Sequence, residues 1–278
     1  MSRRTDTLGT STPTLTLPGV GVDGFYTPVE RHGDVWLKRD DLYSYAGRYG
    51  GKVRTCQRYG ERAVATGAVG LITAGSRHSP QVSIVSAVAA HLGLACRVHV
   101  PTGATTPELD AAMSAGAEVC RHKPGYNSVI ISRAQRDAAA YPDWLYVPFG
   151  METDVAVEET SHQAEALDVP CERVVVPVGS GMSLCGVLAG LCARQVARHL
   201  APPRVVGVVV GADPTHRLDT YAPMWRISGT ELLDAGVPYA RHVEASVGGV
   251  DLDPVYEAKC VPFLEAGDLL WVVGHRRT

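Results

Sequence analysis

The feature that most constrains this chain is a repeated alternation of short apolar runs with longer stretches of helical periodicity. The short runs are rich in Val, Leu and Ile. Several are apolar on both faces, which is what a strand buried inside a parallel sheet requires. They predict strands at VWLKRD (35–40), VGLITA (69–74), ACRVHVP (95–101), AEVCR (117–121), WLYVPF (144–149), RVVVPVG (173–179), RVVGVVVG (204–211) and DLLWVVG (268–274).

The stretches between these runs have the spacing of helices. They predict helices at 52–66, 80–92, 106–115, 127–140, 154–167, 182–199, 229–235 and 254–265. Strands that alternate with helices are typical of the α/β class, with mostly parallel sheets and flanking helices. Residues 1–20, rich in Thr, Pro and Gly, predict an extended lead-in to this fold.

The composition argues against several classes of function. The chain has 278 residues, 45% hydrophobic and 20% charged, as in globular proteins of one large or two modest domains. A net charge of −3 means that the chain has no overall excess of positive charge for binding nucleic acid or an anionic membrane. The first residues lack the apolar segment of a secretory signal, and no apolar run has the length of a membrane span. We therefore expect a soluble, cytoplasmic protein that acts on a small molecule.

The seven cysteines lie scattered, mostly in apolar runs, and none forms a CxxC pair. Their odd number and their spacing favour buried thiols over a zinc site or a disulfide framework. No metal site is expected.

The segment PVGSGMSLCGVLAGL (177–191) carries the strongest chemical signal. A buried strand runs into Gly179, Ser180, Gly181, Met182 and Ser183, and a helix of small residues follows. Glycines allow close approach of the backbone, and the first amides of a helix attract a phosphate group. The segment predicts a phosphate cradle, although it is neither a Walker loop nor GxGxxG. The alternative is a plain strand–helix turn with Ser183 as the N-cap.

Lys52 stands in YGGKVR (49–54), at the predicted start of a helix. A lysine there opposes the helix dipole, which mildly disfavours a purely structural role. Burial beside a phosphate site would lower the pKa of its amine and favour the neutral form that makes a Schiff base. A solvated helix-start charge is one alternative. A P-loop lysine is another, but no Ser or Thr follows Lys52 as a P-loop requires.

Two further helix starts gather polar side chains. In TAGSRHSPQVSIVSAVAAHLGL (73–94), polar side chains at four positions are more than one helix cap needs, so capping and a ligand-facing role both stay open. These residues are Ser76, His78, Ser79 and Gln81. In VDLDPVYEAKC (250–260), Asp253 and Pro254 predict a helix start with Tyr256 and Glu257 in its first turn.

Together these segments resemble, in order and spacing, the fold type II (tryptophan synthase beta-like) pyridoxal-phosphate enzymes. The nearest group is that of 1-aminocyclopropane-1-carboxylate deaminase and D-cysteine desulfhydrase. The resemblance implies a homodimer of two-lobed chains, with 1–51 and 149–278 as the larger, cofactor-binding lobe and 52–148 as the smaller. It spans most of residues 27–274 and is carried by WLKRDDL (36–42), YGGKVR (49–54), HSPQ…AVAAHLGL (78–94), VPFG (147–150), VGSGMS (178–183) and LDPVYEAK (252–259).

The resemblance also implies roles for single residues. Lys52 matches the lysine that forms the Schiff base with pyridoxal 5′-phosphate (PLP), and Gly179 to Ser183 match the loop that holds its phosphate. Ser79 matches a serine near substrate and cofactor, and Tyr256 a tyrosine beside the reacting carbon. Glu257 matches an acid that faces the pyridine nitrogen. Such an acid favours a protonated ring and hence a stronger electron sink, which points to the deaminase-like branch.

Several departures from the family pattern concern the substrate side. The asparagine expected before the lysine is Gly51, and Pro80 replaces a second asparagine and removes a backbone N–H. A second family tyrosine has no evident match before LDPVYE. The region 212–248 is shortened, and relatives continue into a helix where this chain stops at GHRRT.

These patterns predict a PLP-dependent enzyme that acts at the α carbon of an amino-acid-type substrate, as a lyase or deaminase. Lys52 would carry the proton, with Ser79 and Tyr256 as helpers. One alternative is decarboxylation or other α-carbon chemistry on an unusual or tethered amino acid, including one on a modified nucleobase. Another is a catalytically silent homologue that binds PLP or a metabolite.

Overall fold

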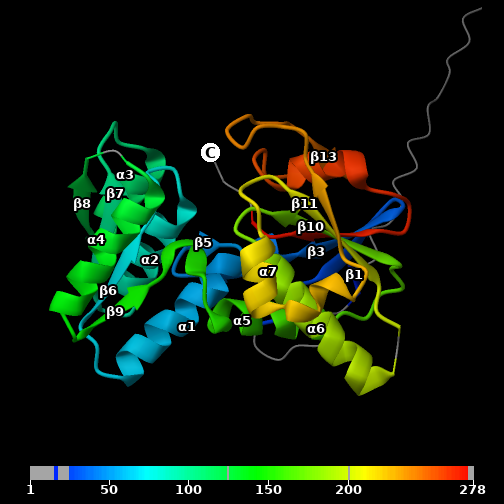
Figure 1. Ribbon diagram of the computed structural model, residues 1–278, viewed down its shortest axis with the longest axis horizontal. Coiled ribbons are helices and arrows are strands. Elements are labelled where there is room, and N and C mark those ends of the chain that lie inside the picture. Colours follow the sequence, from blue (N-terminus) through cyan, green and yellow to red (C-terminus); the bar gives the residue numbers. More distant parts are fainter. Residues whose placement is uncertain (1–15, 18–24, 124, 200, 275–278) are drawn as a thin grey trace, which may run out of the picture.

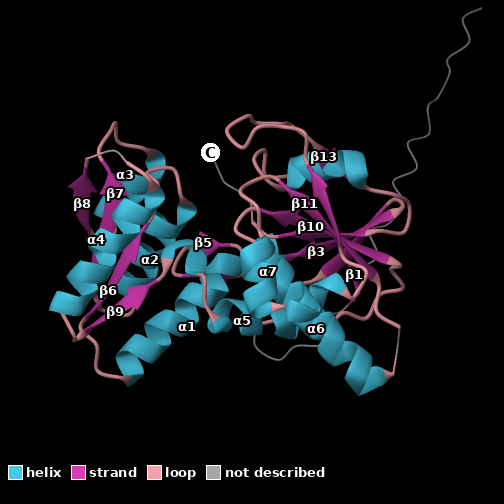
Figure 2. Cartoon of the chain, in the orientation of Figure 1, coloured by secondary structure: helices cyan, strands magenta, loops and turns pink. Residues whose placement is uncertain are grey.

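Two separate sheets with helices packed on them form the two halves of the molecule in Figure 1, and Figure 2 colours the same elements by type. The computed structural model describes residues 16–17, 25–123, 125–199 and 201–274. The predicted α/β class, with largely parallel sheets and flanking helices, is confirmed.

The larger sheet has seven strands in the order β1-β2-β3-β15-β10-β11-β12. From β3 to β12 all neighbours run parallel, while β1 and β2 add an antiparallel edge. The central β10 and β15 are buried along almost their whole length, which explains why their sequences are apolar on both faces. The strands are β1 (Thr16–Leu17), β2 (Val29–His32), β3 (Val35–Arg39), β10 (Arg173–Val178), β11 (Arg204–Val209), β12 (Glu231–Asp234) and β15 (Leu269–Val272).

The smaller sheet has four parallel strands in the order β8-β7-β6-β9. Two short hairpins complete the strands of the described residues: β4 with β5, and β13 with β14. The bounds are β6 (Gly70–Ala74), β7 (Ala95–Pro101), β8 (Glu118–His122), β9 (Trp144–Val147), β4 (Ser44–Tyr45), β5 (Arg48–Tyr49), β13 (Ser246–Val247) and β14 (Val250–Asp251).

Helix starts are set by side-chain caps at three places. Ser79, Thr106 and Thr153 each accept a hydrogen bond from an amide of the first turn of α2, α3 and α5. The α-helices are α1 (Gly51–Ala65), α2 (Pro80–His91), α3 (Pro107–Ser114), α4 (Asn127–Ala140), α5 (Asp154–Glu165), α6 (Met182–Arg198) and α7 (Thr215–Tyr221). Short 3₁₀ helices are η2 (Asp40–Leu42), η3 (Phe149–Met151), η4 (Pro223–Arg226) and η5 (Glu257–Phe263).

Each sheet has its own apolar core. In the larger sheet, β10 feeds two cores, because successive side chains of a strand point to opposite faces. Val174 and Val176 pack with residues of α6, whereas Val175 packs on the other face with residues of η5. A separate core joins the smaller sheet to α1, α2 and α3.

Two predicted helices are wrong. The stretch 229–235 contains the strand β12, because its residues pair in parallel with the exposed edge of β11, and this pairing overrides a weak helical pattern. The stretch 254–265 forms a turn and then the 3₁₀ helix η5, which contains Pro262; a proline inside an α-helix removes a hydrogen bond and clashes with the preceding turn. The helix α7, the strand β2 and both hairpins were not predicted.

Three further expectations concern the chain as a whole. The lead-in at 1–20 lies outside the described residues, apart from the two residues of β1. Among the described residues, no helix combines the length and the apolar character needed to cross a bilayer. All seven cysteines are free thiols, and Cys56, Cys96, Cys185 and Cys260 are buried as predicted, whereas Cys192 is exposed.

Candidate active site

A cavity of ≈ 270 Å³ lies between the two halves, at the carboxyl ends of β10 and β15. Ligands of open α/β sheets bind at this edge, because the loops there leave the strands and enter helices. Its walls come from both halves: Gly47, Arg48, Tyr49, Gly50, Lys52, Pro80, Ser83, Ile84, Glu108, Pro177, Gly179, Ser180, Gly181, Ser183, Asp253, Tyr256, Glu257, Val273 and Gly274.

Most of the site residues predicted from the sequence line this one cavity, namely Lys52, Gly179, Ser180, Gly181, Ser183, Tyr256 and Glu257. Two do not. Met182 is buried in the core, and Ser79 caps α2. The cavity is also lined by Arg48 and Glu108, which lie outside every quoted motif, and by Tyr49, the first residue of YGGKVR, to which the sequence assigned no role.

The start of α6 forms a cradle for an anion. Gly181 is the N-cap, in the left-handed region with a φ of 91°, and within the described residues no side chain caps this helix. Its first amides and the positive end of its dipole therefore face the cavity without a side-chain partner. Ser183 lies inside the first turn, so the alternative interpretation with Ser183 as the N-cap is wrong. Gly179 has no room for a side chain, since a Cβ there would lie 2.6 Å from the ring of Tyr256.

Lys52 is the second residue of α1, and its position depends on the glycines before it. Gly50 is the N-cap with a φ of 105°, and a Cβ there would lie 3.1 Å from the carbonyl oxygen of Val273. The amide of Gly51 donates to the same oxygen over 2.9 Å. The two glycines thus allow α1 to begin directly against the end of β15, with the half-buried Lys52 in the cavity wall.

A buried carboxylate explains why residue 51 is glycine. Asp40 accepts hydrogen bonds from Arg54 (2.8 Å), Thr27 (2.9 Å) and Trp271 (3.3 Å). Burial opposes ionisation of Asp40, but the charge and hydrogen bonds of Arg54 hold its pKa below the ordinary value. A Cβ at Gly51 would lie 2.8 Å from the Oδ2 of this carboxylate, which its partners hold in place. The asparagine of the family pattern does not fit here.

Glu257 lines the cavity and has one buried oxygen without a partner among the described residues. Its side chain is buried, and its Oε1 accepts from the amides of Val273 (2.7 Å) and Gly274 (3.2 Å). Its Oε2 has no hydrogen-bond partner among the described residues. Burial, and then the charge of Asp253, raise the pKa of Glu257 well above its ordinary value, against the effect of the backbone hydrogen bonds. A buried oxygen left in this way fits a ligand nitrogen that shares a proton with it.

Tyr256 has a tyrosine partner that the sequence did not reveal. The hydroxyl oxygens of Tyr239 and Tyr256 lie 2.8 Å apart, and the two rings meet edge to face. The Lys259 amine donates to the carbonyl oxygens of Pro238 and Tyr239, which holds this loop in place. Tyr239 is thus a second tyrosine beside Tyr256, in the part of the chain that precedes LDPVYE. Its own segment, GVPYA, carries no family signature.

The polar side chains at the start of α2 mostly serve the fold. Buried Gln81 donates to the Thr73 hydroxyl (2.9 Å) and the Pro148 carbonyl (2.8 Å), and accepts from the Gly150 amide (2.8 Å). Ser79 accepts from the Gln81 amide over 3.3 Å. The helix instead presents Pro80, Ser83 and Ile84 to the cavity.

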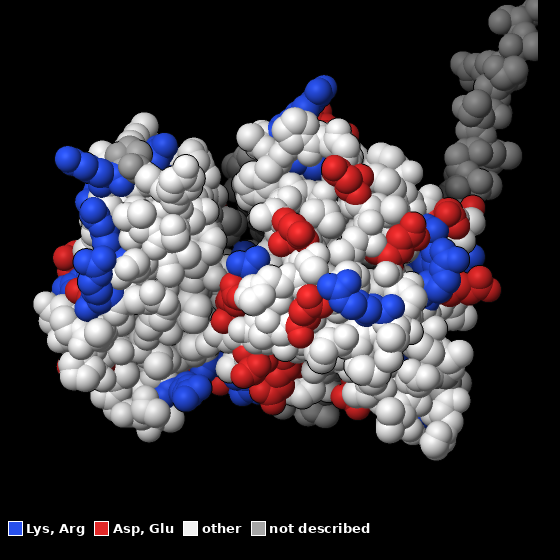
Figure 3. Space-filling view, viewed as in Figure 1, with Lys and Arg blue, Asp and Glu red and all other residues white. Residues whose placement is uncertain are grey.

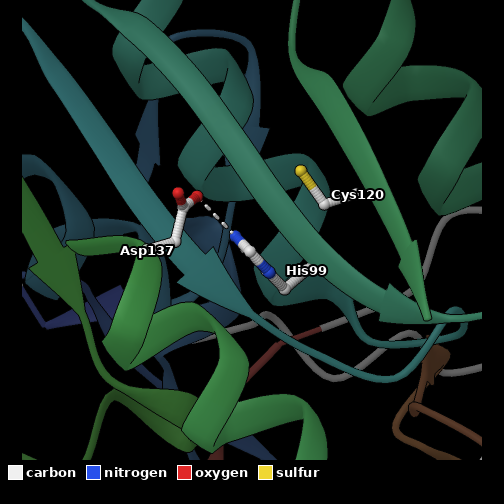
Figure 4. Close-up of side chains that lie close together, drawn as sticks. All are labelled: His99, Cys120 and Asp137. Carbon is white, nitrogen blue, oxygen red and sulfur yellow. Dashed lines mark hydrogen bonds and ion pairs between the residues drawn. The ribbon is translucent and has the colours of Figure 1, made fainter. Parts of the chain in front are cut away.

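A second polar cluster lies between β7, β8 and α4, away from the cavity (Figure 4). Ligand atoms of His99, Cys120 and Asp137 lie within 4.8 Å of one another, close enough to hold a metal ion. Asp137, however, already accepts from both Arg97 (3.0 Å) and His99 (2.8 Å). Burial raises the pKa of the Cys120 thiol to about 11, which disfavours the thiolate that a metal needs. We interpret the cluster as a hydrogen-bonded network.

The network predicts a weakening of the fold at mildly acidic pH. Burial, and then the charges of His99 and Arg133, lower the pKa of His122 below 6.5. As the pH falls below 6.5, the unfolded chain binds a proton that folded His122 does not, so the free energy of unfolding falls. Urea unfolding between pH 7.5 and 5.5 should show a smaller loss for His122→Gln than for wild type. The exposed His216→Gln is the control, and equal losses in all three proteins would contradict the prediction.

The face of the molecule drawn in Figure 3 carries charges of both signs. Figure 3 shows acidic and basic side chains interspersed over this face, with a hollow between the two halves. The view agrees with the small net charge of −3.

Comparisons with known proteins found matches in sequence and in fold. The model of one family, described as pyridoxal-phosphate dependent enzyme, matches residues 6–258. A 1-aminocyclopropane-1-carboxylate deaminase of Methylobacterium sp. (strain 4-46) is 25% identical, over 84% of this chain and 84% of the relative. A D-cysteine desulfhydrase of Salmonella schwarzengrund (strain CVM19633) is 29% identical, over 84% of this chain and 81% of the relative.

Solved structures share the fold. An "ACC deaminase homologue" superposes with a TM-score of 0.73 at 22% identity, over 95% of this chain and 89% of the other. The processed form of threonine deaminase isoform 2 from Solanum lycopersicum gives a TM-score of 0.60 at 14% identity, over 88% of this chain and 79% of the other. The resemblance seen in the sequence is confirmed.

Proposed function

Because the chain belongs to the family of pyridoxal-phosphate dependent enzymes, we propose that it breaks a bond at the α carbon of an amino-acid-type substrate, as a lyase or deaminase. The observation that supports this most is the convergence of three groups on one cavity. These are the Lys52 side chain, the uncapped start of α6 and the Glu257 carboxyl, whose Oε2 has no partner among the described residues. A cofactor with an aldehyde, a phosphate and a ring nitrogen needs one partner for each.

The residues of the cavity divide the work of holding this cofactor. Lys52 would bind the aldehyde, the amides from Gly179 to Ser183 the phosphate, and Glu257 the ring nitrogen. When bound, PLP supplies an electron sink for the pair of electrons left at the α carbon. Because the Oε2 of Glu257 is buried and the pKa of this carboxyl is raised, Glu257 would hold a proton for the ring nitrogen and shield it from water.

The same residues would move protons. With the cofactor held in the cavity, the amine of Lys52 would be the group that carries a proton to or from the α carbon. Tyr256 lies in the cavity wall, and its hydrogen bond with Tyr239 orients the phenol hydroxyl as a helper. Ser79 stays a weaker prediction, because it caps α2 and is absent from the residues that line the cavity.

The Glu257 carboxyl should make the stability of the cofactor-free protein depend on pH. Its pKa is raised in the folded state, so its contribution to stability is full below the ordinary value of 4.5 and is lost as the pH rises through the raised value. From pH 5 to 8, the free energy of unfolding of wild type should therefore fall relative to that of Glu257→Gln. Urea unfolding of both proteins at four pH values measures this, and parallel curves would show that Glu257 ionises normally.

One observation favours a second candidate. Pro80 lines the cavity where the family pattern has asparagine, and it offers neither a side-chain donor nor a backbone N–H to a substrate carboxylate. The lost donors leave the substrate carboxylate with fewer partners, which supports the alternative of decarboxylation of an unusual or tethered amino acid, including one on a modified nucleobase.

A panel of D- and L-amino acids tests the proposal. The purified protein, loaded with PLP, is scored for ammonia, 2-oxo acid and carbon dioxide. Ammonia with 2-oxo acid supports the lyase or deaminase, and carbon dioxide alone supports the decarboxylase. A spectral change on adding amino acids without any product identifies a silent homologue and overturns both.

Three broader expectations belong to the same proposal. We propose that 1–51 with 149–278 forms the larger, cofactor-binding lobe and 52–148 the smaller, with the cavity between them. We further propose a homodimer that works in the cytoplasm. Limited proteolysis and sedimentation measure the first two.

A further inference from the structure

We propose that Glu108 determines substrate specificity, by selecting ligands that present a positively charged amine to the cavity and rejecting those that present a carboxylate. The expected substrate class is a basic amino acid, with one amine at the reacting carbon and a second one on its side chain. This inference rests on the proposed function, because it concerns the same cavity.

Glu108 belongs to the wall that the smaller sheet and its helices contribute. It lies in the first turn of α3, lines the cavity, and accepts a hydrogen bond from the hydroxyl of Ser83 on α2. Ser83 Oγ also lies 3.0 Å from the carbonyl oxygen of Pro80. A hydroxyl has one proton and serves one acceptor at a time. Among the described residues Glu108 has no other hydrogen bond or ion pair, so its carboxylate keeps acceptor capacity for a ligand.

An acid in the first turn of a helix has an ordinary explanation, because it stabilises the positive end of the dipole. In α3, Asp110 can stabilise the dipole in this way, because it lies in the same first turn and is exposed to solvent. Glu108 differs from Asp110 in facing the cavity and in its contact with Ser83. The dipole therefore explains why Glu108 is stable as an anion there, but not why it lines the site.

The charges of the cavity support this assignment. Its acidic residues are Glu108, Asp253 and Glu257, and its cations are Arg48 and Lys52. Asp253 accepts from the amides of residues 255 and 256, and Glu257 from those of residues 273 and 274. Glu108 is thus the acidic residue of the described wall that is not tied to backbone amides, and Arg48 is the cation left for a substrate carboxylate once Lys52 holds the cofactor.

The neighbours of Glu108 strengthen the selection. Pro80 has no N–H, so this wall lacks the backbone donor that would stabilise an anion, while Ser83 orients the carboxylate of Glu108. A carboxylate brought to this wall would face a like charge without a compensating donor. An ammonium group would gain a charge-assisted hydrogen bond.

Calorimetric titration tests the proposal with three amino acids of similar length, each as both enantiomers: ornithine, norvaline and glutamate. Wild type should bind ornithine most tightly and glutamate most weakly. In Glu108→Gln, which keeps the shape and the contact to Ser83, ornithine should bind about tenfold more weakly or worse, as expected when a charge-assisted bond becomes neutral. Glutamate should bind more tightly, and norvaline should be unchanged.

Asp110→Asn is the matched control, since it removes an equal charge from the same turn outside the cavity. The proposal is overturned if Glu108→Gln leaves the ratio of the ornithine and glutamate affinities within twofold of wild type. It is also overturned if Asp110→Asn shifts that ratio equally, or if wild type binds none of the three amino acids.

The titrations are run on cofactor-free and on PLP-loaded protein. Failure of Lys52 to take up PLP would sink the proposed function, while the preference for cations would still be measured in the cofactor-free cavity. Uptake of PLP without any charge preference would sink the specificity proposal alone.

Discussion

Lys52→Ala is expected to abolish the covalent attachment of PLP and to lower turnover by about 10³-fold, the middle of the range for a group that transfers a proton in the rate-limiting step. The reason is positional. Lys52 is the lysine in the cavity wall, held there by the glycine pair at the start of α1. Borohydride reduction of PLP-loaded protein, followed by peptide mass analysis, should find the added mass on Lys52 in wild type and on no peptide of the variant.

The other three lysines of the chain allow the adduct on Lys52 to be distinguished from attachment elsewhere. Lys38 donates to the Thr27 carbonyl and to Gln163, and Lys259 donates to two carbonyls of its own loop. Lys123 is exposed, so Lys123→Ala is the control and should keep both the adduct and the turnover. An adduct that survives in Lys52→Ala would show that another amine holds the cofactor, and the assignment of the site would be wrong.

Arg54→Met is expected to cost about 3–5 kcal/mol of folding free energy, because it leaves the carboxylate of Asp40 buried without its ionic partner. The Arg54 and Asp40 side chains are 1% and 2% exposed, and their atoms approach to 2.8 Å. Arg54 also packs over the ring of Tyr43, which methionine only partly replaces. Urea unfolding of cofactor-free protein measures the loss.

The matched control is an ion pair exposed on both sides. The side chains of Arg198 and Asp168 are 41% and 85% exposed, so Arg198→Met should cost less than about 1 kcal/mol. The double variant Arg54→Met with Asp40→Asn should recover part of the loss, because no buried charge is then left alone. Similar losses for Arg54→Met and Arg198→Met would mean that Asp40 reaches water when its partner is removed.

The prediction from sequence succeeded where the signal is local. The strands at 173–178 and 269–272 are apolar on both faces, and this pattern belongs to a buried parallel strand in any fold. It failed where a distant segment decides. The residues of β12 became a strand because β11 offered an unpaired edge, and nothing within 229–235 reports that edge.

The residues of the candidate site also fall into those that a local motif predicts and those that only distant contacts reveal. Lys52 and the segment from Gly179 to Ser183 could be found because their motifs are continuous in the chain. Tyr239 and Glu108 could not be found, because their importance lies in contacts with Tyr256 and Ser83 that cross from one segment to another. The glycine at position 51 was visible as a departure, but its cause, the carboxylate of Asp40, appears only in the folded chain.

The peptide at Val273 has a consequence for how this site can change. Its carbonyl oxygen bonds the amide of Gly51, next to Lys52, and its amide bonds the Oε1 of Glu257. One residue at the end of β15 therefore fixes the distance between two segments. One carries the amine that would hold the cofactor, and the other carries the acid that would face its ring. The wall that carries Glu108 is built on other helices and takes no part in this spacing. Substitutions in that wall can therefore exchange one substrate for another, while the spacing between Lys52 and Glu257, and with it the type of chemistry, stays unchanged.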